Sequence, residues 1–412
     1  MRLPAFLSAL FALGTMTALP AQRPLGEDAL ALVEACNAFA GDLLPMLGQA
    51  GNPTCSPASI AIALTMLQPG ARSATADELG QVLHLPPTLR GERLLTAAAD
   101  LLQGLGKPRR RTEGESQASL TITNDLWAQQ GFALQQDYVA ALRRAFGAPP
   151  TLLDFAADPE AARQTINRHI ADRTNQRIEQ LIGPGLVDTA TRVVLTNALW
   201  FRAPWTDEFA KGATVDEAFH LDGDHTVTLP TMHKTNHCGY VETEQWQAVT
   251  LSFADTTICC EIVLPRPGVA VDTALTALLR GANRKGLQHE RVAIALPRFK
   301  VATSHSLRTP LQRLGMRTSF TTAADFSGIA SGPRAEDRVH VDEVVHRSWV
   351  SVDEQGAEAS AATAVVMRVG AAIPIGEPKE FKVDRPFAFA LRDAVTGLLL
   401  FVGRVDDPRG ES

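Results

Sequence analysis

The sequence predicts a single α+β domain. Apolar residues recur at helical spacing through most of the first half of the 412-residue chain, whereas the second half consists mainly of short apolar runs typical of strands. No linker or shift in composition separates the two halves, and there is no internal repeat with a period of about 20 to 50 residues. The composition, 45% hydrophobic and 20% charged, supplies ample material for one large core.

The first segment of the chain is typical of a secretory signal. Arg2 precedes an apolar run at residues 6–13, and small residues then lead to Ala21. We expect residues 1–21 to be a signal peptide, followed by a mature domain of residues 22–412 in the extracellular space or the periplasm. The run is too short to span a bilayer comfortably. The alternative to a signal peptide is a buried first helix.

Helical periodicity appears at several places in the first half. Residues 32–43 and 94–105 each place apolar side chains on one helical face. Thr75 and Glu78 have the spacing of a capping box, which predicts a helix that begins just after Thr75. Residues 165–182 predict one continuous helix, with these side chains pointing inward: Ile166, Ile170, Ile178 and Leu181.

Strands are predicted from apolar and β-branched runs that polar turns separate. Two of them lie in the first half and the others follow. They are residues 120–128, 192–201, 226–232, 258–265, 291–299, 349–354, 386–393 and 398–405.

The chain carries no motif that indicates an enzyme. There is no G-x-S-x-G, no H-E-x-x-H and no phosphate-binding glycine loop, so we expect no catalytic activity and no cofactor; a catalytic triad formed by scattered residues is the weaker alternative. His233, His237 and Cys238 have metal-like spacing, but we expect them on a surface loop rather than at a metal site. The five cysteines are odd in number and lack a CxxC pair, which favours buried free thiols.

The charge pattern suggests little about partners. A net charge of -6 gives no indication of nucleic acid, and we expect a monomer without a membrane partner. One basic run, formed by Lys107, Arg109, Arg110 and Arg111, is either a solvated loop or a polyanion site.

Residues 354–368, EQGAEASAATAVVMR, form an unusual stretch of small residues without proline. Strand side chains alternate between faces, so Glu358 and Arg368 fall on one face, whereas every second residue from Ala357 to Met367 falls on the other, which is uncharged. A buried lone charge would oppose insertion into a sheet, and a proline would remove a backbone donor. The stretch is therefore competent to enter a sheet as a strand with its uncharged face in the core.

Several long motifs, in order, resemble the serpin family over essentially the whole mature chain. They are NPTCSPASIAIALTML, GARSATADEL, LTNALWFRAPW, LPRFK, LGMRTSFTTAADFSGI, VHVDEVVHRSWVSVDEQGAEASAATA and FKVDRPFAFALRDAVTGLLLFVGRVDDP. The resemblance implies three sheets, about nine helices and an exposed reactive loop at about residues 354–380. It also implies a suicide inhibitor of serine, or cysteine, proteases. A protease that cleaves the loop is trapped as an acyl-enzyme when the loop inserts into the largest sheet.

The resemblance also assigns residues to the parts of this mechanism. The reactive bond is expected at Gly370–Ala371, with Val369 and Arg368 as alternative residues before the cleaved bond. A small residue there suits an elastase-like or subtilisin-like protease, and Arg368 suits a trypsin-like one. Two alternative functions stay open: a non-inhibitory binding or carrier protein on the same fold, and a secreted hydrolase.

Three groups of residues are expected to support insertion. The hinge comprises Glu354, Gly356, Ala357, Glu358, Ala359, Ser360, Ala361, Ala362 and Thr363. The shutter, where the sheet parts, comprises Ser56, Ser59, Asn197 and His346. Trp205 and Arg298 lie at the point of loop entry, and Arg298 is expected to pair with Glu354.

Overall fold

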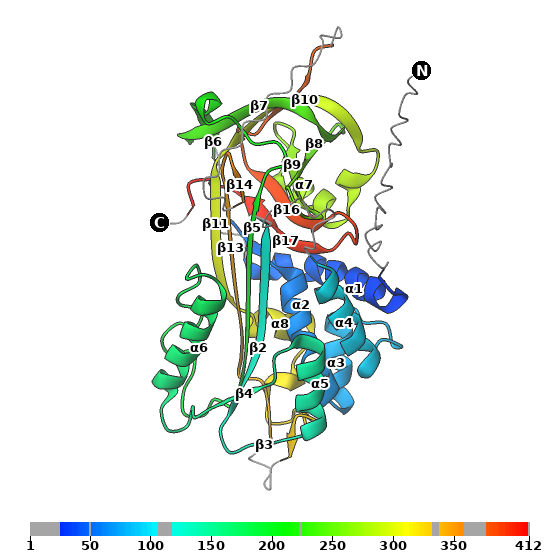
Figure 1. The fold of residues 1–412 in the computed structure, drawn as a ribbon, viewed down its shortest axis with the longest axis vertical. Coiled ribbons are helices and arrows are strands. Elements are labelled where there is room, and N and C mark those ends of the chain that lie inside the picture. The colour runs from blue at the N-terminus through cyan, green and yellow to red at the C-terminus, as the bar shows by residue number, and fades with distance from the viewer. Residues whose placement is uncertain are drawn as a thin grey trace, which may run out of the picture.

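A computed structural model describes residues 25–48, 51–105, 118–221, 225–331, 338–357 and 376–410. These residues form eight α-helices and three β-sheets, which confirms the α+β class and the expected number of sheets (Figure 1). The resemblance implied about nine helices, one more than the described residues contain. The expected signal peptide, residues 1–21, lies outside the described part of the chain.

A six-stranded sheet runs along the long axis of the molecule (Figure 1). Its strands, in spatial order, are β11 (Phe299–Ser306), β13 (Glu343–Val352), β14 (Gly356–Ala357), β5 (Val193–Pro204), β2 (Ser119–Gln129) and β4 (Thr151–Leu153). The strands β5, β11 and β13 are rich in β-branched and apolar residues, and β5 is buried along almost its whole length. Such strands need partners on both faces of the sheet.

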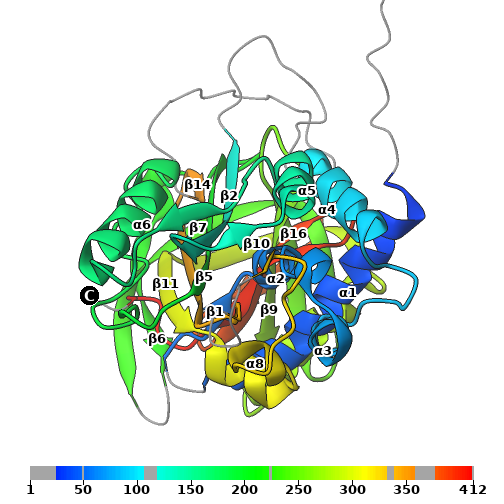
Figure 2. The same ribbon diagram turned by 90° about the horizontal axis from the view of Figure 1, so that it is seen from below.

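Helices cover the two faces of this sheet differently. α6 (Pro159–Arg173) packs on the face that carries Val194 and Ala198 of β5. α2 (Pro57–Thr65) packs on the opposite face, with Leu195 and Leu199 in the main core. Figure 2 shows the sheet from below, between α6 on one side and α2 and α5 on the other. Odd-numbered residues of β5 therefore point into the main core.

A nine-stranded sheet forms the other end of the molecule. Its path is β1 (Thr54–Cys55), β17 (Leu399–Val405), β16 (Phe387–Asp393), β9 (Ile258–Pro265), β8 (Trp246–Ser252), β7 (Thr226–Glu242), β10 (Gln288–Pro297) and β15 (Lys379–Lys382), and β6 (Val215–His220) pairs with β7. α7 (Val271–Leu279) packs on β9 and β16. The third sheet has two strands, β3 (Ala133–Leu134) and β12 (Ala330–Ser331).

The remaining helices are α1 (Glu27–Leu43), α3 (Ser73–Val82), α4 (Glu92–Gly104), α5 (Gln136–Phe146) and α8 (Arg308–Leu314). The predicted apolar face of α1 is buried, and the helix packs on α2 and α4. One segment, Glu27–Leu47, is long and apolar enough to cross a membrane. It consists of α1 and the 3₁₀ turn that follows, and eight residues of α1 lie in the core, as in an ordinary core helix. All five cysteines are buried and free, as predicted.

The predicted capping box was wrong. α3 begins at Ser73, two residues before Thr75. The hydroxyl of Thr75 accepts from the backbone N–H of Asp325 instead, and the Glu78 carboxylate accepts from the backbone of Arg317 and Thr318. The two side chains therefore tie α3 to a distant part of the chain rather than to its own first turn.

Two other predicted elements differ from the structure. α6 ends at Arg173 because Asn175 and Gln176 have left-handed backbone angles, so the rest of the predicted helix is a turn. The prediction of a surface loop at His233 and His237 was also wrong. Both lie within β7, because pairing with β10 from Thr231 to Tyr240 extends this strand well beyond its apolar start.

Candidate functional site

The base of the expected reactive loop is a tight hairpin between β13 and β14. Val352 lies opposite Ala357, and the N–H of Asp353 donates to the carbonyl of Gly356 over 3.0 Å. The Asp353 carboxylate closes the turn by accepting from the N–H of Gln355 over 2.8 Å. An aspartate that accepts from the backbone two residues later is a common turn former, so the sequence itself favours this bend.

β14 lies between β13 and β5 at one end of the long sheet. Gly356 is opposite Pro204 and Ala357 is opposite Ala203, whereas further along β13 and β5 pair directly with each other as parallel strands. Gly356 has φ of 152°, and a Cβ there would lie 2.1 Å from the carbonyl oxygen of Ala203. Only glycine fits this slot without displacing β5.

The loop base is held by the ion pair expected between Arg298 and Glu354. The guanidinium donates to both carboxylate oxygens over 2.7 to 3.0 Å. The Thr214 hydroxyl donates to the same carboxylate, whose side chain is only 4% exposed. Burial alone would raise the pKa of Glu354, but the hydrogen bonds from Arg298 and Thr214 outweigh it and lower the pKa. The carboxylate is therefore ionised and firmly positioned at neutral pH.

The segment of residues 205–209 fastens the same turn from the other side. The indole N–H of Trp205 donates to the carbonyl of Asp353 over 2.9 Å, and its backbone N–H donates to Gln355 over 2.8 Å. The backbone N–H of Phe209 donates to the carbonyl of Glu354 over 2.9 Å. All three carbonyls of the turn are thus bound by one short segment.

The four expected shutter residues come together between α2 and the long sheet. Ser56 caps α2 by accepting from the N–H of Ser59, and its own N–H donates to Nε2 of His346 over 3.0 Å. The other nitrogen, Nδ1, therefore carries the proton and donates to Asn197 over 2.5 Å, while Asn197 donates to Ser59. Burial lowers the pKa of His346 to about 3, and His305 nearby adds to the effect, so the imidazole is neutral.

The other expected site residues lie outside the described part of the chain. These are Glu358, Ala359, Ser360, Ala361, Ala362 and Thr363 of the hinge, the reactive-bond candidates Arg368, Val369, Gly370 and Ala371, and the basic residues Lys107, Arg109, Arg110 and Arg111. Thr214, Asp353 and Phe209 also hold the loop base, and they were not predicted from the sequence. Asp353 was detectable as a turn former, but a lone threonine or phenylalanine carries no local signal.

The chain belongs to the serpin family. A family model described as serpin (serine protease inhibitor) matches residues 34–408. The fold and the hairpin at the loop base agree with that membership.

Several known proteins are similar to this chain. An uncharacterized serpin-like protein of Thermococcus kodakarensis is 37% identical over 92% of this chain and 86% of its own length. The leukocyte elastase inhibitor of Bos taurus is 31% identical over 90% of this chain and 97% of its own length. Serpin48 of Tenebrio molitor has a solved structure with a TM-score of 0.77 and 28% identity, covering 91% of this chain and 98% of that one. The thermophilic serpin Tengpin in its native state has a TM-score of 0.82 at 23% identity over 94% of this chain and 96% of that one, which supports the fold alone.

Proposed function

We propose that the protein is a suicide inhibitor of serine proteases that inserts its cleaved reactive loop between β13 and β5. The protease serine attacks a carbonyl within residues 368–370, the peptide C–N bond breaks, and the protease is left as an ester on the new carboxyl end. Insertion of the loop before water hydrolyses that ester traps the protease. The leukocyte elastase inhibitors among the relatives support the protease-inhibitor class.

The single observation that carries this proposal is the position of β14. Its two residues already occupy the slot between β13 and β5, so the sheet is parted at the end where the loop begins. The strands beyond that point pair directly and must separate to admit more of the loop. Addition of a strand to an opened sheet gains a full set of main-chain hydrogen bonds on both sides.

The register of β14 defines where each further hinge residue would lie. A strand continued in this register places Ala359 opposite Phe201 and Ala361 opposite Leu199. Both Phe201 and Leu199 face the main core, as Ala357 does. The uncharged face of the loop would therefore be buried, and Glu358 would fall on the other face. The alternation in the sequence and the register in the structure support the same orientation.

The same register places Thr363 between Asn197 and His346. These two residues are direct neighbours across β5 and β13, so the bond between the imidazole and the amide must break during insertion. A hydroxyl both donates and accepts, so Thr363 can satisfy the two separated groups. Leaving either group unsatisfied in this buried position would cost about 1–3 kcal/mol.

The target class follows from the reactive-bond candidates. Gly370 favours an elastase-like or subtilisin-like protease, and Arg368 favours a trypsin-like one. The signal-like residues 1–21 support secretion, so these targets would be extracellular or periplasmic.

Mixing the protein with an elastase, a subtilisin and a trypsin tests the proposal on denaturing gels. We expect a covalent adduct with at least one of them. Sequencing of the released C-terminal peptide locates the bond: a peptide starting at Ala371 follows cleavage after Gly370, and one starting at Val369 follows cleavage after Arg368. Clean cleavage by all three proteases without any adduct would favour a non-inhibitory binding protein instead.

A further inference from the structure

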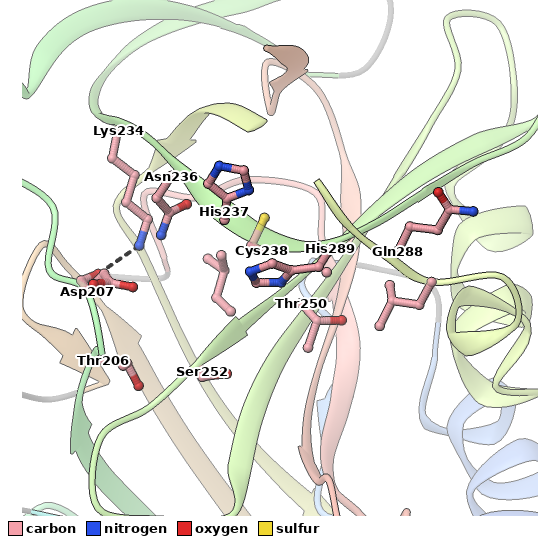
Figure 3. A pocket seen from close by; sticks show the side chains of 13 residues that line it. Thr206, Asp207, Lys234, Asn236, His237, Cys238, Thr250, Ser252, Gln288 and His289 are labelled. Carbon is pink, nitrogen blue, oxygen red and sulfur yellow. Dashed lines mark hydrogen bonds between the residues drawn. The ribbon is translucent and has the colours of Figure 1, made fainter. Parts of the chain in front are cut away.

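Lys234 of β7 occupies a special position beside the loop base. It lies in the wall of a cavity of about 470 Å³ between β7, β8, β10 and residues 206–207 (Figure 3). The strand presents Lys234, Asn236 and Cys238 on one side, and Figure 3 shows the ammonium group of Lys234 directed at Asp207. Nothing in the local sequence distinguishes this lysine from an ordinary surface lysine.

The contacts of Lys234 all go to the segment of residues 205–209. Its Nζ donates to the carbonyl of Asp207 over 2.8 Å. The same nitrogen lies 4.1 Å from the centre of the Phe209 ring and 5.7 Å from that of Trp205. An ammonium group over an aromatic face is attracted to the ring, and the attraction increases as water is excluded. Lys234 therefore fixes the path of this segment through one hydrogen bond and one close cation–π contact.

This segment is also the one that binds the turn of the reactive loop. Trp205 and Phe209 donate to the three carbonyls of residues 353–355, and this turn joins β13 to the strand that would be inserted. The turn sets the register of every hinge residue that follows, because a slip by one residue would turn the charged face of the loop into the core. Whatever holds residues 205–209 thus holds the register of insertion.

We propose that Lys234 is a positioning residue for loop insertion, which clamps residues 205–209 so that the loop-base turn guides the cleaved loop into its correct register. This inference rests on the proposed inhibitory function. In this role Lys234 acts on the loop through Trp205 and Phe209. Loss of the clamp is expected to slow insertion and to let water release the protease first.

The clamp has a pH dependence of its own. Burial lowers the pKa of Lys234 to about 8, although the charge of Asp207 acts in the opposite direction. Below that pH the ammonium is charged and the cation–π contact is complete; above it the neutral amine loses that contact. Lys234 also lines a second cavity, together with residues of β6, β10 and β15. The other titratable groups around the two cavities are His233 and His237 of β7, His289 of β10, Glu217 of β6, and Glu380 and Lys382 of β15.

The test compares Lys234→Met, which keeps the aliphatic stem, with Lys234→Arg, which keeps the charge. Lys285→Met, at an exposed lysine just before β10, is the matched control. The measurement is the number of inhibitor molecules consumed for each protease molecule trapped. It uses the protease that gives the strongest covalent adduct with the wild type. A contact of this class is worth a factor of roughly 3 to 30 in an equilibrium. We expect consumption to rise about threefold or more in Lys234→Met, and to stay near the wild-type value in Lys234→Arg and in the control.

The dependence of this consumption on pH distinguishes a positioning role of Lys234 from a general loss of structure in the variant. Consumption by the wild type is expected to rise between about pH 7 and pH 9, around the pKa of Lys234, while Lys234→Arg stays flat because arginine remains charged. If Lys234→Met does not fold, Phe209→Leu removes the aromatic face instead and should show the same increase. If Lys234→Met consumes no more inhibitor per trapped protease than the wild type does, the inference is overturned, although inhibition itself stands. The same result in Phe209→Leu overturns it where that variant replaces Lys234→Met. Failure of the wild type to form any adduct would overturn the proposed function itself.

Discussion

The ion pair between Arg298 and Glu354 offers a quantitative test of the loop base. Glu354→Gln keeps the shape of the side chain but removes its charge. The variant loses charge-assisted hydrogen bonds from the guanidinium, which now span 2.7 to 3.0 Å. Because the side chain at position 354 is only 4% exposed, water cannot fully replace the hydrogen bonds that are lost there.

The magnitude follows from the exposure of the two partners. Arg298 is 48% exposed and regains part of its hydration, so the loss is smaller than the cost of breaking a fully buried pair. We expect Glu354→Gln to lower the free energy of unfolding of the uncleaved protein by roughly 2 kcal/mol. For a chain of this length this corresponds to a melting temperature lower by about 2–3 °C.

A double-mutant cycle isolates the interaction from other effects of the substitutions. Urea unfolding of the wild type, Glu354→Gln, Arg298→Gln and the double variant should give a coupling free energy of roughly 1–2 kcal/mol. The matched control is the pair of Arg144 and Glu92, which are both more than 60% exposed. That pair should couple by about 0.5 kcal/mol or less. Equal coupling in the two cycles would refute the view that the loop base is held by a buried ion pair.

Substitutions at three further positions test other parts of the structure. Gly356→Ala places a Cβ against β5, and we expect it to lower the melting temperature of the uncleaved protein through a clash worth about 1–3 kcal/mol; an unchanged temperature would contradict the tight slot. Ser73→Gly should stabilise the protein by about 1 kcal/mol in urea unfolding, because Ser73 has a left-handed φ of 48°, whereas Ser73→Ala should not. His346 stays neutral in the folded state, with a pKa of about 3, while the unfolded chain takes up a proton below about pH 6.5. Folded stability should therefore fall by up to about 1.4 kcal/mol per pH unit from pH 6.5 towards pH 3, and His346→Gln should remove this part of the decline; parallel pH curves for the two proteins would contradict it.

Elements with strong periodicity could be predicted from the sequence. The helix α1 and the strands β9, β16 and β17 were found because local apolar patterns specify them. The hydrogen bonds of Glu78 could not be predicted, because its partners at Arg317 and Thr318 are far away in the chain. The strand at His233 is polar in sequence and becomes a strand because β10 pairs with it from Thr231 to Tyr240.

The residues of the candidate site also differ in whether the sequence alone could predict them. The alternation of the hinge was visible in the sequence, and the pairing of Glu354 with Arg298 was expected only from the family resemblance. Thr214 and Lys234 were not detectable, since each acts through contacts with residues distant in the chain and neither belongs to a repeating pattern.

The melting temperature of the protein before and after cleavage of its reactive loop tests the central claim most directly. A strand inserted between β13 and β5 would replace their one direct ladder by two, a net gain of one ladder of hydrogen bonds, each worth about 0.5–1.5 kcal/mol, and would bury the uncharged face of the loop. We therefore expect the cleaved protein, with both fragments retained, to melt about 10 °C or more above the uncleaved protein. An unchanged or lower melting temperature after complete cleavage would contradict insertion of the loop and the inhibitory mechanism built on it.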